Sequence, residues 1–411
     1  MGLNRIVVSL EEASMEQENP PSTTDTSRVG PAPADPSIRD GRGSLPFAGD
    51  SDSLQRLLFG NQGMRVAWSV ALFGALFYIF REFGYVFFGT VYSMIFPLDW
   101  LEGTSALTVT LGESVQLFAL VAAAAIVAKV ERRPGNLLAF NLAGPRKIFH
   151  FTTGLVIGFA ALSALIGGLA WGGWLRFGPV ALSGAAVLKF GLLWALAFLT
   201  VGFFEEGAFR CYLQFTLTRG INFWWALGAI ALIFCDLTRR GAGNGIGGVY
   251  LIAALGLIPC LLLERLRSES SGFWQAAWVT STFFGAIHTW NRGENWIGIF
   301  AAASVGFALC VSVKLTGSAW WAIGFHAAWD WAETYFYGTP DSGLPAKGHL
   351  LTTNPAGAAI WSGGTDGPEG SLLIIPLILL LLLALLALYG RGKRGVAHLA
   401  AAAGLTEQAT G

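Results

Sequence analysis

Long apolar segments with few charged residues are the feature that most constrains the fold of this chain. A membrane-spanning helix needs about 20 mostly apolar residues. Of the 411 residues, 54% are hydrophobic and 13% are charged, whereas about 25% of residues are charged in soluble proteins. The sequence therefore predicts an all-α, polytopic transmembrane bundle of about 8–10 helices. The apolar segments are residues 66–96, 107–128, 151–174, 181–218, 223–237, 249–263, 273–288, 296–313, 319–337 and 372–389.

Composition divides the chain into four parts. Residues 1–62 are polar, rich in Pro, Ser, Asp and Thr, and are predicted to be a disordered tail without a cleavable signal peptide. The N-terminal transmembrane helices follow in residues 63–176. Residues 181–337 form the predicted functional core, with an inserted segment near 220–270. Residues 371–411 supply a C-terminal transmembrane helix and a basic tail.

Charge and cysteine usage exclude several classes of function. Lys and Arg number 26, as do Asp and Glu, so the formal net charge is zero and no basic footprint for nucleic acid is present. The four cysteines stand singly without a C-x-x-C pair, which disfavours disulfide or cysteine–metal roles. The spacing Gly154-x-x-x-Gly158 predicts close helix packing. Membrane lipid is the first expected partner.

Ionisable residues inside apolar segments carry the functional signal. A charge at the bilayer centre costs about 2.5–3.5 kcal/mol, so each one needs a reason. Glu206 and Arg210 are four residues apart and can pair along one helix face. Glu205 lies about 100° round the helix from Glu206, and we expect it to point into a cavity. The alternative is a structural Glu206–Arg210 clamp, with Glu205 satisfied by its neighbours.

Two histidines lie in the later apolar segments. His288 ends an aromatic segment in the pattern Phe284-x-x-x-His288. His326 and Asp330 are four apart and share a helix face, so the carboxylate can orient the imidazole or bind a ligand itself. Either histidine alone is also consistent with a hydrogen-bonded core residue. The other embedded charges are interpreted as structural or as snorkelling to the interface: Glu113, Lys189, Asp236, Glu264 and Glu333.

A glutamate and histidines gathered in one membrane site can activate water. The glutamate and one histidine can bind and deprotonate the water molecule. A second histidine with a polar partner can stabilise the oxyanion that forms when water attacks a carbonyl. Alternatively, Glu205, His288 and His326 supply a zinc ligand set with an open position for water. The residues themselves leave both chemistries open.

The three motifs in order, each in an apolar segment, resemble the CPBP family, which includes CAAX prenyl proteases and the bacteriocin-processing or immunity proteins called the Abi family. The motifs are Glu-Glu-x-x-x-Arg at 205–210, Phe-x-x-x-His at 284–288 and His-x-x-x-Asn/Asp at 326–330. The resemblance covers about residues 181–337. It implies a CAAX-protease-like helical fold and an intramembrane endopeptidase that acts on a membrane-associated peptide or protein.

The resemblance also implies a role for each site residue. Glu205 and His288 would activate the water, and His326 with Asp330 would form the oxyanion hole. Glu206 and Arg210 would support the site. Under the metalloprotease interpretation, Glu205, His288 and His326 would instead hold zinc. The resemblance is equally consistent with a metal-free glutamate mechanism.

Two departures from the family pattern affect these expectations. The eukaryotic prenyl-protein proteases carry Asn at the position of Asp330, and an ionised Asp cannot donate a hydrogen bond to an oxyanion. Asp330 must therefore be protonated, orient His326, or bind metal. The spacing from Arg210 to His288 is also longer than is typical of the family, which predicts the inserted segment.

Other functions compete with the endopeptidase. A catalytically silent membrane immunity or scaffolding protein of the same family would use the polar cluster for binding. A secondary transporter would use the Glu–His set as a proton relay, but no inverted repeat with broken helices in matching halves is evident. We expect a multi-pass protein of the bacterial cytoplasmic (inner) membrane.

Overall fold

Helices form nearly all of the regular structure in the computed structural model, which describes residues 55–60, 63–95, 105–131, 146–239, 258, 261–262, 271–291, 293–344 and 346–390. Most of the predicted tail (1–62), much of the inserted segment (220–270) and the end of the C-terminal part (371–411) lie outside these residues. The last residues of the predicted tail are described, and strand β1 (Phe59–Gly60) there pairs with β2 (Gly63–Met64).

Five helices in the described residues are long and apolar enough to cross a membrane. They are α2 (Val66–Ile95), α3 (Ala106–Val130), α4 (Lys147–Trp171), α5 (Ala185–Glu206), which continues through the π-helix η3 (Gly207–Leu213) into α6 (Gln214–Thr218), and α10 (Trp296–Thr316). The prediction of a helical, multi-pass integral membrane protein is confirmed.

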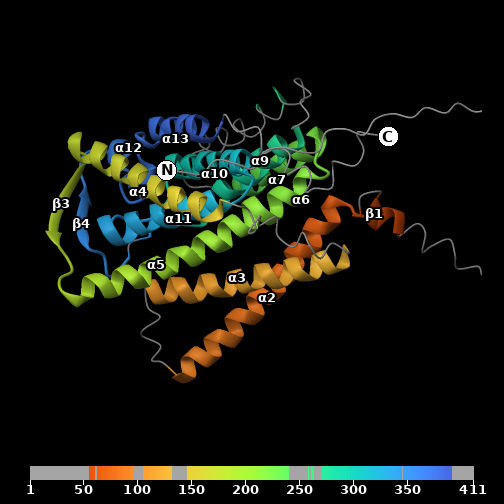
Figure 1. Cartoon of the computed structure of the whole chain (residues 1–411), viewed down its shortest axis with the longest axis horizontal. Helices are drawn as coiled ribbons and strands as arrows, with labels where there is room; N and C mark the ends of the chain where they lie inside the picture. Colours follow the sequence, from red (N-terminus) through yellow and green to blue (C-terminus); the bar gives the residue numbers. More distant parts are fainter. Residues whose placement is uncertain are drawn as a thin grey trace, which may run out of the picture. The chain divides into compact units, whose positions relative to one another are not determined.

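Shorter helices complete the bundle (Figure 1). They are α7 (Phe223–Arg239), α9 (Ser271–Ile287), which continues as the 3₁₀ turn η4 (His288–Trp290), α11 (Trp320–Asp330), which continues as the π-helix η5 (Trp331–Tyr337), α12 (Ala359–Ser362), the 3₁₀ turn η6 (Pro368–Gly370) and α13 (Ile374–Tyr389). Helix α3 runs beside α5, and α9 packs against α10.

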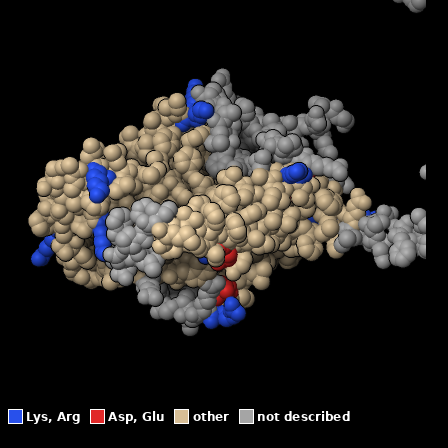
Figure 2. All heavy atoms as spheres, turned by 90° about the horizontal axis from the view of Figure 1, so that it is seen from below, with Lys and Arg blue, Asp and Glu red and all other residues tan. Residues whose placement is uncertain are grey.

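Large apolar side chains lie on the outer surface of the long helices. On α5, Leu188, Leu192 and Leu196 are each more than half exposed and follow one another at intervals of four residues. Figure 2 shows a face on which Lys, Arg, Asp and Glu are sparse. Exposed apolar surface of this extent is unusual in soluble proteins and fits contact with lipid.

Helices α4 and α11 pack backbone to backbone through glycines. A Cβ at Gly154 would overlap the carbonyl oxygen of Trp321, and a Cβ at Gly158 would overlap that of Phe325. From the other side, Gly324 faces the backbone of α4 in the same way. The close packing predicted from Gly154-x-x-x-Gly158 is therefore present. It fixes the helix that carries His326.

Gly158→Ala is expected to lower the free energy of unfolding by about 1–3 kcal/mol, because the added methyl group must push α4 away from α11. The matched control is Gly167→Ala in the same helix, where nothing lies within 4 Å of an added Cβ. Thermal unfolding of the two variants in one detergent measures the difference. Equal stability of the two variants would contradict this packing.

A two-stranded ribbon was not anticipated from the sequence. Strand β3 (Leu175–Val180) pairs antiparallel with β4 (Leu351–Pro355), with Leu175 opposite Pro355. The ribbon joins the chain after α4 to the chain after η5. It thereby fixes one end of the segment 338–373, whose acidic residues contribute to the site described next.

Candidate active site

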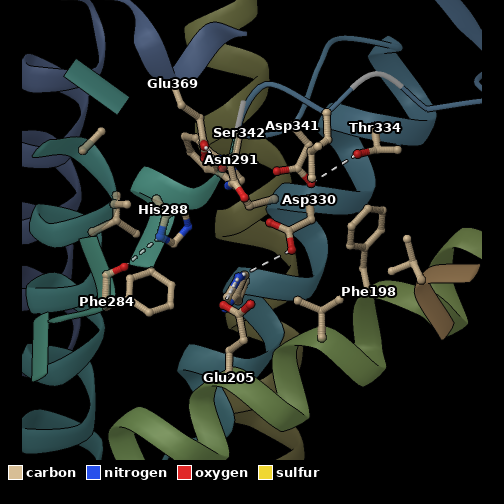
Figure 3. A pocket seen from close by; sticks show the side chains of 18 of the residues that line it. Phe198, Glu205, Phe284, His288, Asn291, Asp330, Thr334, Asp341, Ser342 and Glu369 are labelled. Carbon is tan, nitrogen blue, oxygen red and sulfur yellow. Dashed lines mark hydrogen bonds and ion pairs between the residues drawn. The ribbon is translucent and has the colours of Figure 1, made fainter. Parts of the chain in front are cut away.

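A cavity of about 300 Å³ lies among α3, α5, α9, α10 and α11 and the segment that follows η5. It is lined by the four predicted catalytic residues, Glu205, His288, His326 and Asp330. Figure 3 shows Glu205 and Asp330 directed into this space from different helices, with His288 on the facing wall. The three sequence motifs therefore meet at one cavity, although they lie far apart in the chain.

The supporting residues Glu206 and Arg210 lie behind the cavity wall. Glu206 is fully buried, and its Oε1 accepts a hydrogen bond from Arg210 Nη1 at 3.1 Å. The same oxygen lies 2.8 Å from His326 Nδ1. A carboxylate is only an acceptor, so this nitrogen carries the proton and donates. The expected Glu206–Arg210 clamp is present, and it also orients His326.

The other nitrogen of His326 faces two carboxylates. Nε2 lies 3.7 Å from Glu205 Oε2 and 3.5 Å from Asp330 Oδ2. Acceptors at both ring nitrogens favour the doubly protonated imidazolium, which donates from both sides. His326 thus presents a positively charged N–H group to the cavity. Of the three roles considered for Asp330, this contact supports the orientation of His326.

His288 has a different protonation pattern. Its Nδ1 lies 2.7 Å from the carbonyl oxygen of Phe284 one turn earlier, so Nδ1 donates, and in the neutral tautomer Nε2 keeps its lone pair. The Phe284 ring packs edge-on against His288, with 4.9 Å between ring centroids. The guanidinium of Arg210 also packs on the Phe284 ring, 4.4 Å from the ring centroid. The Phe-x-x-x-His motif thus links the histidine to the buried ion pair.

Gly306 on α10 is a supporting residue that the sequence did not indicate. A Cβ at this position would lie 2.8 Å from Arg210 Nη2. The absent side chain therefore leaves the room in which the guanidinium stacks on Phe284. Desolvated cation–π contacts of this kind contribute about 2 kcal/mol or more.

Both acidic motifs are followed at once by π-helix. The α-helical pattern of α5 ends at Glu206, where η3 begins, and that of α11 ends at Asp330, where η5 begins. Short π-helical segments inside α-helices are rare and are frequent at functional sites. The wider turns therefore mark the same two places as the motifs.

The cavity has an acidic wall that the sequence interpretation missed. This wall contains Asn291, Asp341, Ser342 and Glu369. Glu113 of α3 also lines the cavity, and its Oε1 accepts a hydrogen bond from Gln116 at 2.8 Å. The snorkelling alternative was wrong for Glu333, which is fully buried. Acidic residues spaced along the loop 338–373 were the available signal, but nothing in their spacing indicated that they converge.

Burial raises the pKa values of acidic residues in the loop 338–373 and of Glu294, which precedes α10. It raises the pKa of Asp341 to about 7, with a further rise from the nearby Glu369 carboxylate. Burial likewise raises the pKa of Asp366 to about 8. For Glu294, burial and then repulsion by Asp366 raise the pKa to about 10. Each of these shifts favours the neutral carboxyl group, so burial reduces the negative charge that Asp341, Asp366 and Glu294 carry near neutral pH.

The predicted zinc set does not form a compact group of ligands. Among the described residues, one group of three His, Cys, Asp or Glu side chains is placed so that it could share one metal ion. Its ligand atoms lie within 4.8 Å of one another, and it consists of Glu333, Asp341 and Glu369. Glu205, His288 and His326 are not grouped in this way, and His326 Nδ1 is engaged by Glu206.

The fold and cavity define a multi-pass helical membrane protein with acid and histidine motifs gathered inside the bundle. Residues 256–332 match the family model described as type II CAAX prenyl endopeptidase Rce1-like. The chain thus carries an Rce1-like (CPBP/Abi) family domain, as the motifs indicated. The match includes the motifs at 284–288 and 326–330, while Glu205 and Glu206 precede it. No curated protein and no solved structure matches the chain.

Proposed function

We propose that this protein is an intramembrane endopeptidase in which Glu205 activates a water molecule. The observation that carries the proposal is the meeting of Glu205, His288, His326 and Asp330 at one cavity. The family match supports a peptide-hydrolysing activity of this type. A buried site with preset donors and acceptors suits attack on a carbonyl, because charged groups act more strongly where water is excluded.

Each residue has a defined part in the reaction. The Glu205 carboxylate takes a proton from water, while the lone pair on His288 Nε2 accepts the second water hydrogen and holds the molecule in place. The water oxygen bonds to the peptide carbonyl carbon, and the carbonyl oxygen becomes an oxyanion. His326 Nε2–H donates to that oxyanion. Glu205 then gives its proton to the leaving nitrogen as the C–N bond breaks. General-base help of this kind contributes about 10²–10⁴-fold, and one oxyanion donor about 10²–10³-fold.

Apolar and aromatic side chains form much of the remaining cavity wall. Trp194, Phe198 and Val201 continue from the Glu205 side, and Val305 and Leu309 face them from α10. Such walls suit a substrate that reaches the site from lipid. We therefore propose a membrane-associated peptide or protein as substrate, with prenylated CAAX-type peptides as the first probe, and a bacterial inner membrane as the location.

The proposal is tested with the full chain in lipid nanodiscs and a fluorogenic farnesylated CAAX peptide. The expected result is a single new carboxyl terminus in the product, identified by mass spectrometry. Cleavage is expected to be unchanged by 1,10-phenanthroline, since the proposed water is held by side chains. Loss of cleavage with the chelator, restored by zinc, would favour the zinc mechanism. Peptide binding without hydrolysis would instead support a catalytically silent immunity or scaffolding protein.

Asp330→Asn is expected to keep peptide cleavage within about tenfold of wild type, because an amide oxygen can still accept from His326 and its N–H group adds an oxyanion donor. Asp330→Ala is expected to lower kcat/KM by about 10²-fold, because it leaves His326 Nε2 without this partner. Rates on the farnesylated peptide measure both. A loss as large for Asn as for Ala would show that the negative charge itself is needed.

A further inference from the structure

Three carboxylates converge at one wall of the cavity, and none of them is assigned a part in the proposed reaction. Glu333 comes from η5, Asp341 from the loop after it, and Glu369 from η6. One oxygen from each lies within 4.8 Å of those of the other two. Asp341 and Glu369 also line the cavity, as Figure 3 shows.

Glu333 is the residue that sets this cluster apart from a group of surface acids. It has no exposed surface, and neither Oε1 nor Oε2 has a hydrogen-bond partner. Within the described residues, no Lys or Arg forms an ion pair with any of the three carboxylates. A carboxylate without a hydrogen bond or a counter-charge is costly to bury, so Glu333 is either neutral or paired with a cation.

Neighbouring donors hold the other two carboxylates in place. Trp329 Nε1–H donates to Glu369 Oε1 at 2.7 Å, and Ser342 Oγ–H donates to Glu369 Oε2 at 3.1 Å. Thr334 Oγ1–H donates to Asp341 Oδ2 at 3.3 Å. Each oxygen accepts one bond and retains a further lone pair. Ligand carboxylates in metal sites are typically held by such outer hydrogen bonds.

We propose that Glu333, Asp341 and Glu369 bind one divalent cation with a preference for oxygen ligands, and that Ca²⁺ fits best. Ca²⁺ takes 6–8 oxygen ligands at about 2.3–2.6 Å in flexible geometry, so three carboxylate oxygens that all lie within 4.8 Å of one another can share one ion. Mg²⁺ demands near-ideal octahedral geometry and shorter distances. Zinc favours His and Cys ligands, which this cluster lacks. The cation would neutralise the buried Glu333 and complete the coordination with water.

Such a cation would connect three segments that are separate in the chain. It would tie η5, which directly follows Asp330, to the loop at Asp341 and to η6. Since Asp341, Ser342 and Glu369 form cavity wall, bound Ca²⁺ would stabilise that wall. The proposed ligands are distinct from Glu205, His288 and His326, so the ion has a structural role in the proposed mechanism.

Terbium luminescence tests the site on the full chain in detergent, after removal of metal with a chelator. The indole of Trp329 donates to a proposed ligand, so it can sensitise Tb³⁺ bound there. We expect saturable Tb³⁺ emission that Ca²⁺ displaces, and one Ca²⁺ per chain by equilibrium dialysis. Glu333→Gln is expected to weaken Ca²⁺ binding by at least about 100-fold, because it removes a charged ligand.

The matched control is Glu113→Gln, which removes a partly buried acid that lines the cavity but lies outside the cluster. It is expected to bind Ca²⁺ as wild type does. No Ca²⁺ bound to the wild-type chain, or unchanged binding in both Glu333→Gln and Asp341→Asn, would overturn the proposal and favour protonated carboxyls. If Glu333→Gln does not fold, wild-type stoichiometry and Asp341→Asn decide the question. These readouts do not depend on peptide cleavage.

Discussion

Glu205→Gln is expected to lower kcat/KM for cleavage of the farnesylated peptide by about 10³-fold or more, because the amide cannot take a proton from water. The substitution keeps the size and polarity of the side chain, and the Glu205 side chain is 23% exposed to the cavity. Folding is therefore expected to survive. Single-turnover cleavage in nanodiscs, with thermal unfolding measured on the same preparation, separates lost chemistry from lost structure.

Glu82→Gln on α2 is the control for removing a membrane-embedded acid, since its side chain is 47% exposed and pairs with Arg81 on the helix surface. Its activity should equal that of wild type. Cleavage by Glu205→Gln at more than about a tenth of the wild-type rate would rule out Glu205 as the general base. The water would then require another acceptor, and His288 Nε2 would be the next residue to test.

Arg210→Met is expected to lower the free energy of unfolding by about 3–5 kcal/mol, because it breaks a buried ion pair and leaves the Glu206 carboxylate with His326 as its cationic partner. The loss also removes the guanidinium from the Phe284 ring, where it lies 4.4 Å from the centroid. His326 would keep its contact with Glu206, so the variant remains informative about the site. Chemical unfolding in mixed micelles gives the free energy.

Two comparisons sharpen this prediction. Arg81→Met removes a surface cation whose ion pair is 3.7 Å long and exposed, so its effect should stay within about 0.5 kcal/mol. In the double variant Glu206→Gln/Arg210→Met, no unpaired charge remains, so the combined cost should be smaller than the sum of the single costs. Additive costs would show that the two side chains are not coupled in the folded protein.

Sequence reasoning predicted those parts of the molecule that depend on local pattern. Apolar length indicates a membrane helix because the bilayer has a fixed thickness, and the long helices confirm it. The spacing of four residues predicted that Glu206 contacts Arg210 and that His326 contacts Asp330, because such positions share a helix face. The order of the three motifs indicated the family, since a charge inside a membrane helix persists only for a reason.

Features that depend on long-range contact were out of reach. The ribbon of β3 and β4 joins segments more than 170 residues apart, and neither strand has an alternating apolar pattern to announce it. The role of Gly306 depends on the direction of the Arg210 side chain. The residues next to Gly306 in the sequence do not determine that direction. Glu333, Asp341 and Glu369 converge only after the loop folds back onto η5. The snorkelling alternative failed for Glu333 for the same reason.

The π-helical segments also affect how related chains should be compared with this one. A π-helix hydrogen-bonds from residue i to i+5 rather than i+4, so each such segment accommodates one additional residue relative to an α-helix. A relative with regular α-helix here would align with a one-residue gap within 207–213 or 331–337. Downstream of an ungapped alignment, every side chain would be assigned to a face about 100° away from its true one. A helical-wheel diagram of the helix that runs from α5 to α6 should therefore be restarted after Leu213.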